Sequence, residues 1–173
     1  MQSGAQKTWM ASSTLLLVGI LSPTMNTAAA QSSTSASSPQ IVLTPESSQK
    51  VIHGAPDRFT GAVRVQSLID AKDEARSTGG QVTFQPGARS AWHTHPLGQI
   101  LIVTDGVGWF QQWSGPVRVM GKGDVIWIPA GVKHWHGATP TTSVTHIAIQ
   151  EDRDGRNVDW LEKVSDDQYR LLK

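Results

Sequence analysis

Short β-type segments, broken at close intervals by glycine and proline, dominate the chain from Phe59 onward. Within them apolar and β-branched residues alternate with polar ones, and turn pairs such as Asp105-Gly106 and Ser114-Gly115 separate the runs. We expect strands at residues 60–65, 81–85, 91–95, 99–104, 108–113, 117–120, 124–128, 133–137 and 144–150. About nine strands in about ninety residues leave little room for helix, which predicts an all-β barrel or sandwich.

Helix is expected only near the end of the chain. Ser165, followed three residues later by Gln168, fits a capping box, in which each side chain bonds the other residue's backbone N–H. This pattern predicts a short helix through Leu171. Trp160 and Leu161 precede it, and we expect their side chains to pin the tail to the barrel.

Five of the six histidines lie in one stretch of the second half of the chain. His93 and His95 are two residues apart in a predicted strand, so both imidazoles leave one face, about 6 to 7 Å apart along the backbone. One metal ion could bind both. Gln99 begins the next predicted strand and could lie over the same ion, while His134 and His136 repeat the two-residue spacing.

The composition of the chain excludes several kinds of site and partner. The chain has no cysteine, which excludes a disulfide framework and a thiolate ligand for a metal. Lys and Arg number 15 and Asp and Glu number 14, without a run of like charge, so nothing indicates nucleic acid or an anionic surface as a partner. A single domain fits this length, and we expect a small-molecule substrate as its partner.

Two stretches resemble the two sequence motifs of the cupin superfamily. The first motif is Gly, five residues, His-x-His, three residues, Glu, six residues, Gly, and the matching positions are Gly87, His93, His95, Gln99 and Gly106. The second is Gly, five residues, Pro-x-Gly, two residues, His, matched by Gly123, Pro129, Gly131 and His134. The resemblance implies a single cupin β-barrel, a double-stranded β-helix of the jelly-roll type, with a short C-terminal helix.

On this footing His93, His95 and His134 are interpreted as metal ligands, with Gln99 as the fourth. Three neutral imidazoles and one oxygen donor suit a first-row divalent ion, and an octahedral ion keeps two positions free for substrate. Gln in the usual Glu position leaves the ion's charge uncompensated, which favours polarising a substrate oxygen over activating dioxygen. The alternative for Gln99 is an amide that only hydrogen-bonds near the ion.

His136 follows His134 by two positions and is expected to face a metal-bound substrate. If its pKa lies near the reference value of about 6.5, it suits proton transfer around neutral pH, as a general acid or base. The alternatives are that His136 is itself a ligand or only polar lining.

Two further strands are expected to contribute to the substrate pocket. His146 and Gln150 share one face of their strand and line the pocket if that face points inward, whereas the alternative for His146 is an ordinary buried histidine. Val82 and Phe84 alternate on their strand and are expected to supply apolar lining.

Three sequence segments resemble those of a narrower group, the manganese-dependent bacterial cupins with hydroxynitrile lyase activity. The segments are AWHTHPLGQ, KHWHGA and VDWLEKVSDDQY. This resemblance implies Mn²⁺ as cofactor, His136 as the base, and R-selective cleavage of cyanohydrins such as mandelonitrile to an aldehyde and hydrogen cyanide. The same scaffold also resembles carboxymuconolactone decarboxylase-like cupins. The donors would also accept Fe²⁺, Co²⁺, Ni²⁺ or Zn²⁺.

Two other functions stay open beside the lyase. One is a metal-dependent dioxygenase or decarboxylase that acts on small aromatic or enolic compounds. The other is a non-catalytic periplasmic cupin that holds a small ligand.

Residues 1–30 read as a secretory signal peptide, with Lys7, an apolar run at 15–21, and small residues up to Ala30 before the expected cleavage site. The alternative is an uncleaved anchor or extension. Residues 31–50, rich in Ser, Thr and Pro, predict a flexible leader, and residues 51–173 are then the cupin domain with its tail helix. We therefore expect a secreted or periplasmic protein.

A small barrel must also protect its edges, so a homo-oligomer, a dimer or tetramer, is expected.

Overall fold

Strands are the main secondary structure of the computed structural model, which describes residues 40–72 and 74–170. The chain divides between Ile41 and Val42 into two units, and the fold described below belongs to the second. The expected signal peptide lies outside the described residues, as do residues 31–39 of the expected leader. Within the described part, no helix has the length and apolar character needed to cross a membrane.

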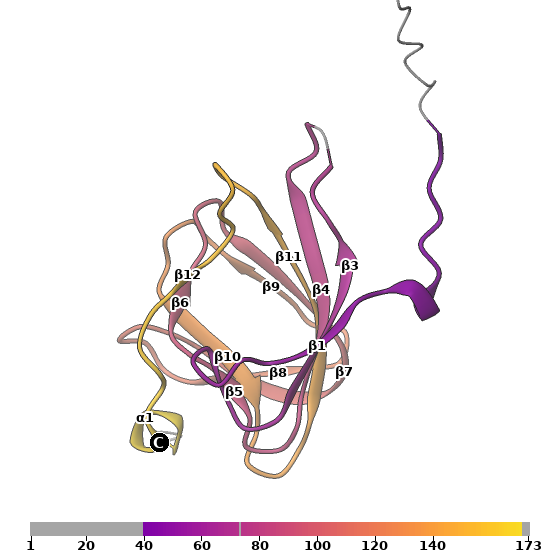
Figure 1. The fold of residues 1–173 in the computed structure, drawn as a ribbon. Helices are drawn as coiled ribbons and strands as arrows, with labels where there is room; N and C mark the ends of the chain where they lie inside the picture. Colours follow the sequence, from indigo (N-terminus) through magenta and orange to yellow (C-terminus); the bar gives the residue numbers. More distant parts are fainter. Residues whose placement is uncertain (1–39, 73, 171–173) are drawn as a thin grey trace, which may run out of the picture. The chain divides into compact units, whose positions relative to one another are not determined.

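Twelve strands pair in one curled antiparallel sheet (Figure 1). They are β1 (Val51–His53), β2 (Phe59–Thr60), β3 (Val63–Ile69), β4 (Ser77–Phe84), β5 (Arg89–Ser90), β6 (His93–Thr94), β7 (Gln99–Gln112), β8 (Arg118–Gly121), β9 (Val125–Ile128), β10 (His134–Ala138), β11 (Val144–Glu151) and β12 (Asp159–Trp160). A 3-10 turn, η1 (Glu46–Ser48), precedes them, and helix α1 (Asp166–Arg170) follows.

The strand order follows a path from one edge of the sheet to the other. The order is β1-β3-β4-β11-β7-β10-β5-β2, with β8 and β9 paired to β7, and β6 paired to both β10 and β12. The predicted all-β barrel with a short C-terminal helix is confirmed. The strands β1 and β12 are additions to the predicted set.

The longest strand, β7, corrects one prediction. The sequence predicts a turn at Asp105-Gly106, but the chain stays in one strand through both residues. The part of β7 before them pairs with β9 and β11, and the part after them pairs with β8 and β10. Gly106 has a left-handed φ of 73°. Two residues earlier the β7–β11 register shifts, because Thr145 pairs with Asp105 but His146 pairs with Val103. β7 therefore carries a bulge at Thr104, and Gly106 follows it where the strand passes from one half of the barrel into the other.

The single strand predicted at 91–95 is instead divided into β5 and β6. β5 pairs with β2 and β10, whereas β6 pairs with β10 and β12. Between them the N–H groups of Ala91 and Trp92 donate to the carbonyl oxygens of Arg58 and Glu162, at 2.7 and 2.9 Å. Distant loop segments thus complete the backbone hydrogen bonding here, which local sequence does not reveal.

Two apolar clusters stabilise the barrel. The inner cluster contains side chains at most 2 % exposed, among them Phe84, Leu101, Val103, Met120 and Val144. The outer cluster lies beneath the C-terminal tail and consists of Trp92, Trp109, Val117, Trp135, Val164 and Tyr169.

Helix α1 begins with the predicted capping box. The N–H of Ser165 donates to Gln168 Oε1 at 2.9 Å, and the N–H of Gln168 donates to Ser165 Oγ at 3.2 Å. These two bonds satisfy N–H groups that the first turn of a helix leaves without partners. The predicted end of the helix, Leu171, lies outside the described residues.

The anchoring of the tail differs in part from the expectation. Trp160 packs its ring on Phe59, with centroids 5.4 Å apart, but Leu161 is 41 % exposed. Tyr169 takes the place expected of Leu161: it is buried in the outer cluster, and its hydroxyl donates to the carbonyl oxygen of Ala138 at 2.8 Å.

Candidate metal centre

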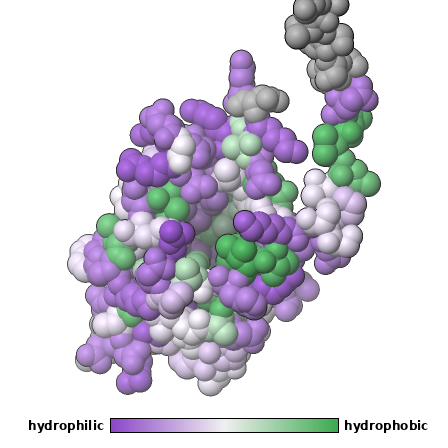
Figure 2. Space-filling view, in the orientation of Figure 1, coloured by the Kyte–Doolittle hydropathy of each residue, from purple (hydrophilic) through white to green (hydrophobic). Residues whose placement is uncertain are grey.

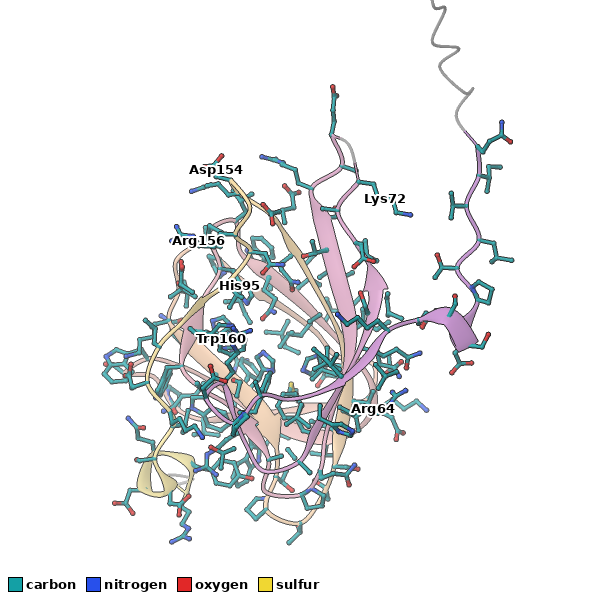
Figure 3. All side chains as sticks on the ribbon, in the orientation of Figure 1. Arg64, Lys72, His95, Asp154, Arg156 and Trp160 are labelled. Carbon is teal, nitrogen blue, oxygen red and sulfur yellow. The ribbon has the colours of Figure 1, made fainter. Side chains whose placement is uncertain are left out.

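Three histidine side chains converge inside the barrel from separate segments. His93 on β6 is the cross-strand partner of His134 on β10, so both side chains leave the same face of the sheet. His95 lies just beyond β6, two residues after His93. One ring nitrogen of each lies within 4.8 Å of those of the other two, and all three residues are buried. Figure 3 shows His95 in the space enclosed by the strands.

Backbone carbonyl groups orient all three rings. The Nδ1 atoms of His93, His95 and His134 bond the carbonyl oxygens of Ala91, Asn157 and Val132, at 2.9, 2.5 and 2.9 Å. Because a carbonyl oxygen only accepts, each Nδ1 carries the proton and each Nε2 presents a lone pair. The Nε2 atom of His95 is buried and has no hydrogen-bond partner in the described residues. A cation bound at the cluster would supply that partner.

Burial keeps these rings neutral. Desolvation lowers the pKa of His134 to about 4. The pKa of His93 is lowered well below its ordinary value, first by burial and then by the neighbouring His134 and His95. Burial also lowers the pKa of His95. Neutral imidazole is the form that ligates a metal, so the cluster is ready to bind one without losing protons.

Gln99 adds an oxygen atom to the cluster. It begins β7, and its Oε1 lies 3.2 Å from Nε2 of His134. Since that nitrogen carries no proton, two acceptors face each other, an arrangement that a shared cation stabilises. The Nε2 of Gln99 donates to Gln150 Oε1 at 3.3 Å, which turns the Gln99 oxygen toward the histidines. Three imidazoles and one amide oxygen form a neutral donor set that fits a first-row divalent ion.

A second histidine pair lies beside this cluster. His136 is buried on β10, with its ring centroid 5.2 Å from that of His93. His146 on β11 is fully buried, and its Nε2 lies 3.1 Å from Nδ1 of His136. The contact between the two imidazoles occupies Nδ1 of His136, which leaves its Nε2 for a molecule bound nearby.

The pKa of His136 differs from the expectation of a value near 6.5. Burial lowers it well below that value, and the rings of His146 and His93 lower it further. The physical reason is that an imidazolium here would be desolvated among other imidazoles. The pKa of His146 is likewise lowered to about 4, mainly by burial. His136 is therefore neutral at physiological pH and, once protonated, returns the proton readily.

A small cavity of about 140 Å³, which we call the inner cavity, adjoins the histidines. Its polar lining comes from His93, His95, Gln99, His136, Gln150 and Asn157. The other lining residues are mainly apolar, namely Phe59, Val65, Val82, Ala148, Val158 and Trp160. The face drawn in Figure 2 is hollowed near its centre, where hydrophobic and hydrophilic residues meet. An apolar cavity with a few convergent polar groups is the usual form of a small-molecule site.

Two of the four predicted pocket residues line this cavity, and two lie behind it. Val82 and Gln150 belong to the wall. Phe84 and His146 are fully buried and form the next layer, with the ring of Phe84 5.7 Å from the rings of both His136 and His146. Alternation along β4 and β11 indicates which residues share a face, but the curvature of the barrel decides which of them reach the cavity.

Part of the wall was not predicted, namely Phe59, Val65, Ala148, Asn157, Val158 and Trp160. Trp160 was expected only to anchor the tail. Its place opposite His93 depends on the pairing of β12 with β6, which no local pattern in the sequence indicates.

A second hollow, of about 370 Å³, shares Val65, Gln150 and Asn157 with the inner cavity. Thr78 Oγ1 accepts hydrogen bonds from Gln150 Nε2 and Asn157 Nδ2, both at 3.0 Å, so these side chains form a polar boundary between the two spaces. A larger hollow of about 440 Å³ lies over β8 and β9, but of the clustered histidines it touches His134 alone. The inner cavity is therefore the candidate substrate site.

Comparison with known proteins places these features in a family. The family model described as "Cupin domain" matches residues 80–149, which contain Gln99 and all five clustered histidines. An (R)-mandelonitrile lyase from Granulicella tundricola is 59 % identical over 117 residues, which cover 68 % of this chain and 89 % of that protein.

Solved structures show the same architecture. A cupin-like protein from Thermotoga maritima, 44 % identical, has a TM-score of 0.63 over 68 % of this chain and 90 % of that chain. A polyketide cyclase from Streptomyces resistomycificus has a TM-score of 0.60, with coverage of 75 % and 91 %. At 19 % identity, this second likeness concerns the fold alone.

Proposed function

Because the chain belongs to the cupin superfamily, we propose that it is a metal-dependent lyase that cleaves aromatic cyanohydrins with R selectivity. The observation that carries the proposal is the meeting of a neutral three-histidine cluster, a further buried histidine and an apolar cavity in one place. The relationship to an (R)-mandelonitrile lyase, at 59 % identity, supports the substrate class.

His93, His95, His134 and Gln99 would hold the metal, which we propose to be Mn²⁺. When bound, a divalent ion supplies Lewis acidity, which stabilises negative charge on a substrate oxygen. The four side chains are neutral and therefore offset none of the charge of the ion.

The inner cavity suits a phenyl group. Its volume is about 140 Å³, and in another protein a dry apolar cavity of about 150 Å³ accommodates benzene. Phe59, Val82 and Val158 would contact the ring of the substrate. The hydroxyl end would then lie toward the histidines.

His136 is the proposed base. Its Nε2 would take the hydroxyl proton of the cyanohydrin, and the O–H electron pair would form the carbonyl bond of the aldehyde. The C–C bond to the nitrile breaks, and its electron pair leaves with cyanide. The imidazolium of His136 then returns the proton to cyanide, which gives hydrogen cyanide. The lowered pKa of His136 favours this return.

The test is benzaldehyde release from mandelonitrile by the purified chain with Mn²⁺, followed by absorbance. We expect release above background, and we expect His136→Ala to keep its bound metal but to lose about 100-fold or more of kcat. His53→Ala, at an exposed histidine of β1, is the matched control and should retain full activity. Full activity in His136→Ala would remove the base assignment. A wild-type chain inactive with every first-row divalent ion would remove the lyase proposal.

The same purified protein can be assayed for the two other functions, a dioxygenase and a binding protein. A dioxygenase would consume oxygen with a phenolic or enolic substrate and depend on Fe²⁺, but the neutral ligand set gives little help to ferric iron. A binding protein would hold mandelonitrile tightly without turnover.

A further inference from the structure

Three side chains form one row across adjacent strands of the barrel wall. His134 on β10 pairs with His93 on β6, and His93 pairs on its other side with Trp160 on β12. Residues directly opposite each other in antiparallel strands project from the same face. Since both histidines project toward the metal cluster, Trp160 also projects inward, and it lines the inner cavity. Figure 3 labels Trp160 and His95 between the strands, and both residues line the inner cavity.

The indole N–H of Trp160 is buried and has no acceptor among the described residues. The fully buried indoles of the outer cluster are different: Nε1 of Trp92 donates to Gln168 Oε1 at 3.3 Å, and Nε1 of Trp135 donates to Gln111 Oε1 at 2.8 Å. An indole nitrogen is a donor only, so a metal ion cannot satisfy it. A buried donor without a partner is costly, which points to an acceptor that arrives with a ligand.

The ring of Trp160 is held firmly in this position. Its centroid lies 4.9 Å from the ring of His93 and 5.4 Å from the ring of Phe59. The guanidinium carbon of Arg58 lies 5.9 Å from the same centroid. Trp160 is therefore a positioned donor beside a proposed metal ligand, which is the arrangement that stabilises developing charge without reorganisation.

We propose that the indole N–H of Trp160 donates a hydrogen bond to an acceptor atom of the molecule bound in the inner cavity. The inference deepens the proposed function and rests on it. In cyanohydrin cleavage the acceptor is the nitrogen of the nitrile group, and this group departs as cyanide. Negative charge on this group grows as the C–C bond breaks, so the hydrogen bond strengthens along the reaction. Trp160 is then a catalytic residue that contacts the leaving group.

The test uses azide, a linear anion like cyanide, with the ¹⁵N-labelled chain loaded with diamagnetic Zn²⁺. Trp160→Phe keeps an aromatic ring but removes the N–H, so the missing indole signal identifies Trp160. We expect azide to shift that indole proton downfield and to leave the signals of Trp92 and Trp135 in place. We also expect Trp160→Phe to bind azide about 10-fold or more weakly, at unchanged zinc content.

Trp127→Phe is the matched control, because Trp127 is 59 % exposed on β9, outside the cavity lining. It should bind azide as the wild type does. A Trp160 signal that stays unchanged at the highest azide concentration, or wild-type azide affinity in Trp160→Phe, would overturn the inference. If circular dichroism shows that Trp160→Phe is unfolded, triple-resonance assignment of the wild type identifies the signal, and its azide shift decides. A wild type with the azide shift but no benzaldehyde release would retain Trp160 as a donor and overturn only the lyase proposal.

Discussion

The group that contacts Nδ1 distinguishes two kinds of histidine in this site. In the three proposed ligands Nδ1 donates to a backbone carbonyl oxygen, so the proton cannot move and Nε2 stays a lone pair. In His136 the partner is instead Nε2 of His146, another imidazole that can donate or accept. The ligands are thus fixed in one tautomer, while His136 can exchange protons, as a base must.

The burial of His146 predicts that low pH destabilises the fold. Its pKa is about 4 in the folded chain, below the ordinary value of about 6.5, so the unfolded chain binds a proton at higher pH. Stability contributed by neutral His146 is therefore complete above about pH 6.5 and falls by roughly 3 kcal/mol as the pH drops to about 4. We expect urea unfolding of the metal-free chain to show this loss, and His146→Gln to reduce the pH slope between these limits.

The control for that slope is His53→Gln, at an exposed position of β1. It should leave the dependence of unfolding free energy on pH as in the wild type. An equal slope in His146→Gln and the wild type would contradict the assignment to His146.

At the scale of elements, β7 joins the two halves of the barrel at Gly106, two residues after the bulge at Thr104. A Cβ added there would clash with the carbonyl oxygen of Ser143, and the φ of 73° disfavours any L side chain. We expect Gly106→Ala to destabilise the fold by about 2 kcal/mol or more beyond the cost of the φ angle alone, measured by urea unfolding.

Gly123 provides the comparison, because it has a φ of 94° but an added Cβ meets no atom within 4 Å. Gly123→Ala should therefore carry only the conformational cost, about 1 to 2 kcal/mol. If both substitutions cost the same, the close approach of β7 to Ser143 is not what requires glycine at position 106.

At the scale of the whole molecule, the outer face of β8 and β9 carries exposed apolar side chains. Val119, Val125 and Trp127 are 60 %, 66 % and 59 % exposed, beside the charged Arg118 and Asp124. An exposed apolar face of this kind favours association with a second copy, in which the apolar side chains would cover each other. We propose a homo-oligomer that buries this face.

Native mass spectrometry of the purified chain tests the proposed homo-oligomer and the proposed export together. We expect a dimer or tetramer whose subunits begin at Gln31, after loss of residues 1–30. Trp127→Glu should shift the population to monomer, because it places a charge in the apolar face. A wild-type monomer would contradict the oligomer, and an intact Met1 in the exported chain would contradict cleavage.

Several features depended only on local sequence and were predictable for that reason. The alternation of apolar residues and turn pairs predicts the strands, and the spacing of Ser165 and Gln168 predicts the capping box that opens α1. The period of two along a strand likewise predicts that His93 and His95 leave the same side of the chain. Each of these patterns spans a few residues, so one segment of sequence contains it completely.

Other features exist only once distant segments pair. The sequence by itself determined the all-β class and the histidines and glutamine that form the candidate site. The tertiary structure decided that Asp105-Gly106 bends a strand rather than ends it, that Phe84 and His146 lie behind the cavity wall, and that Trp160 stands opposite His93. It also decided the lowered pKa of His136, because burial and neighbouring charge arise from packing between strands and not from any order of residues along one of them.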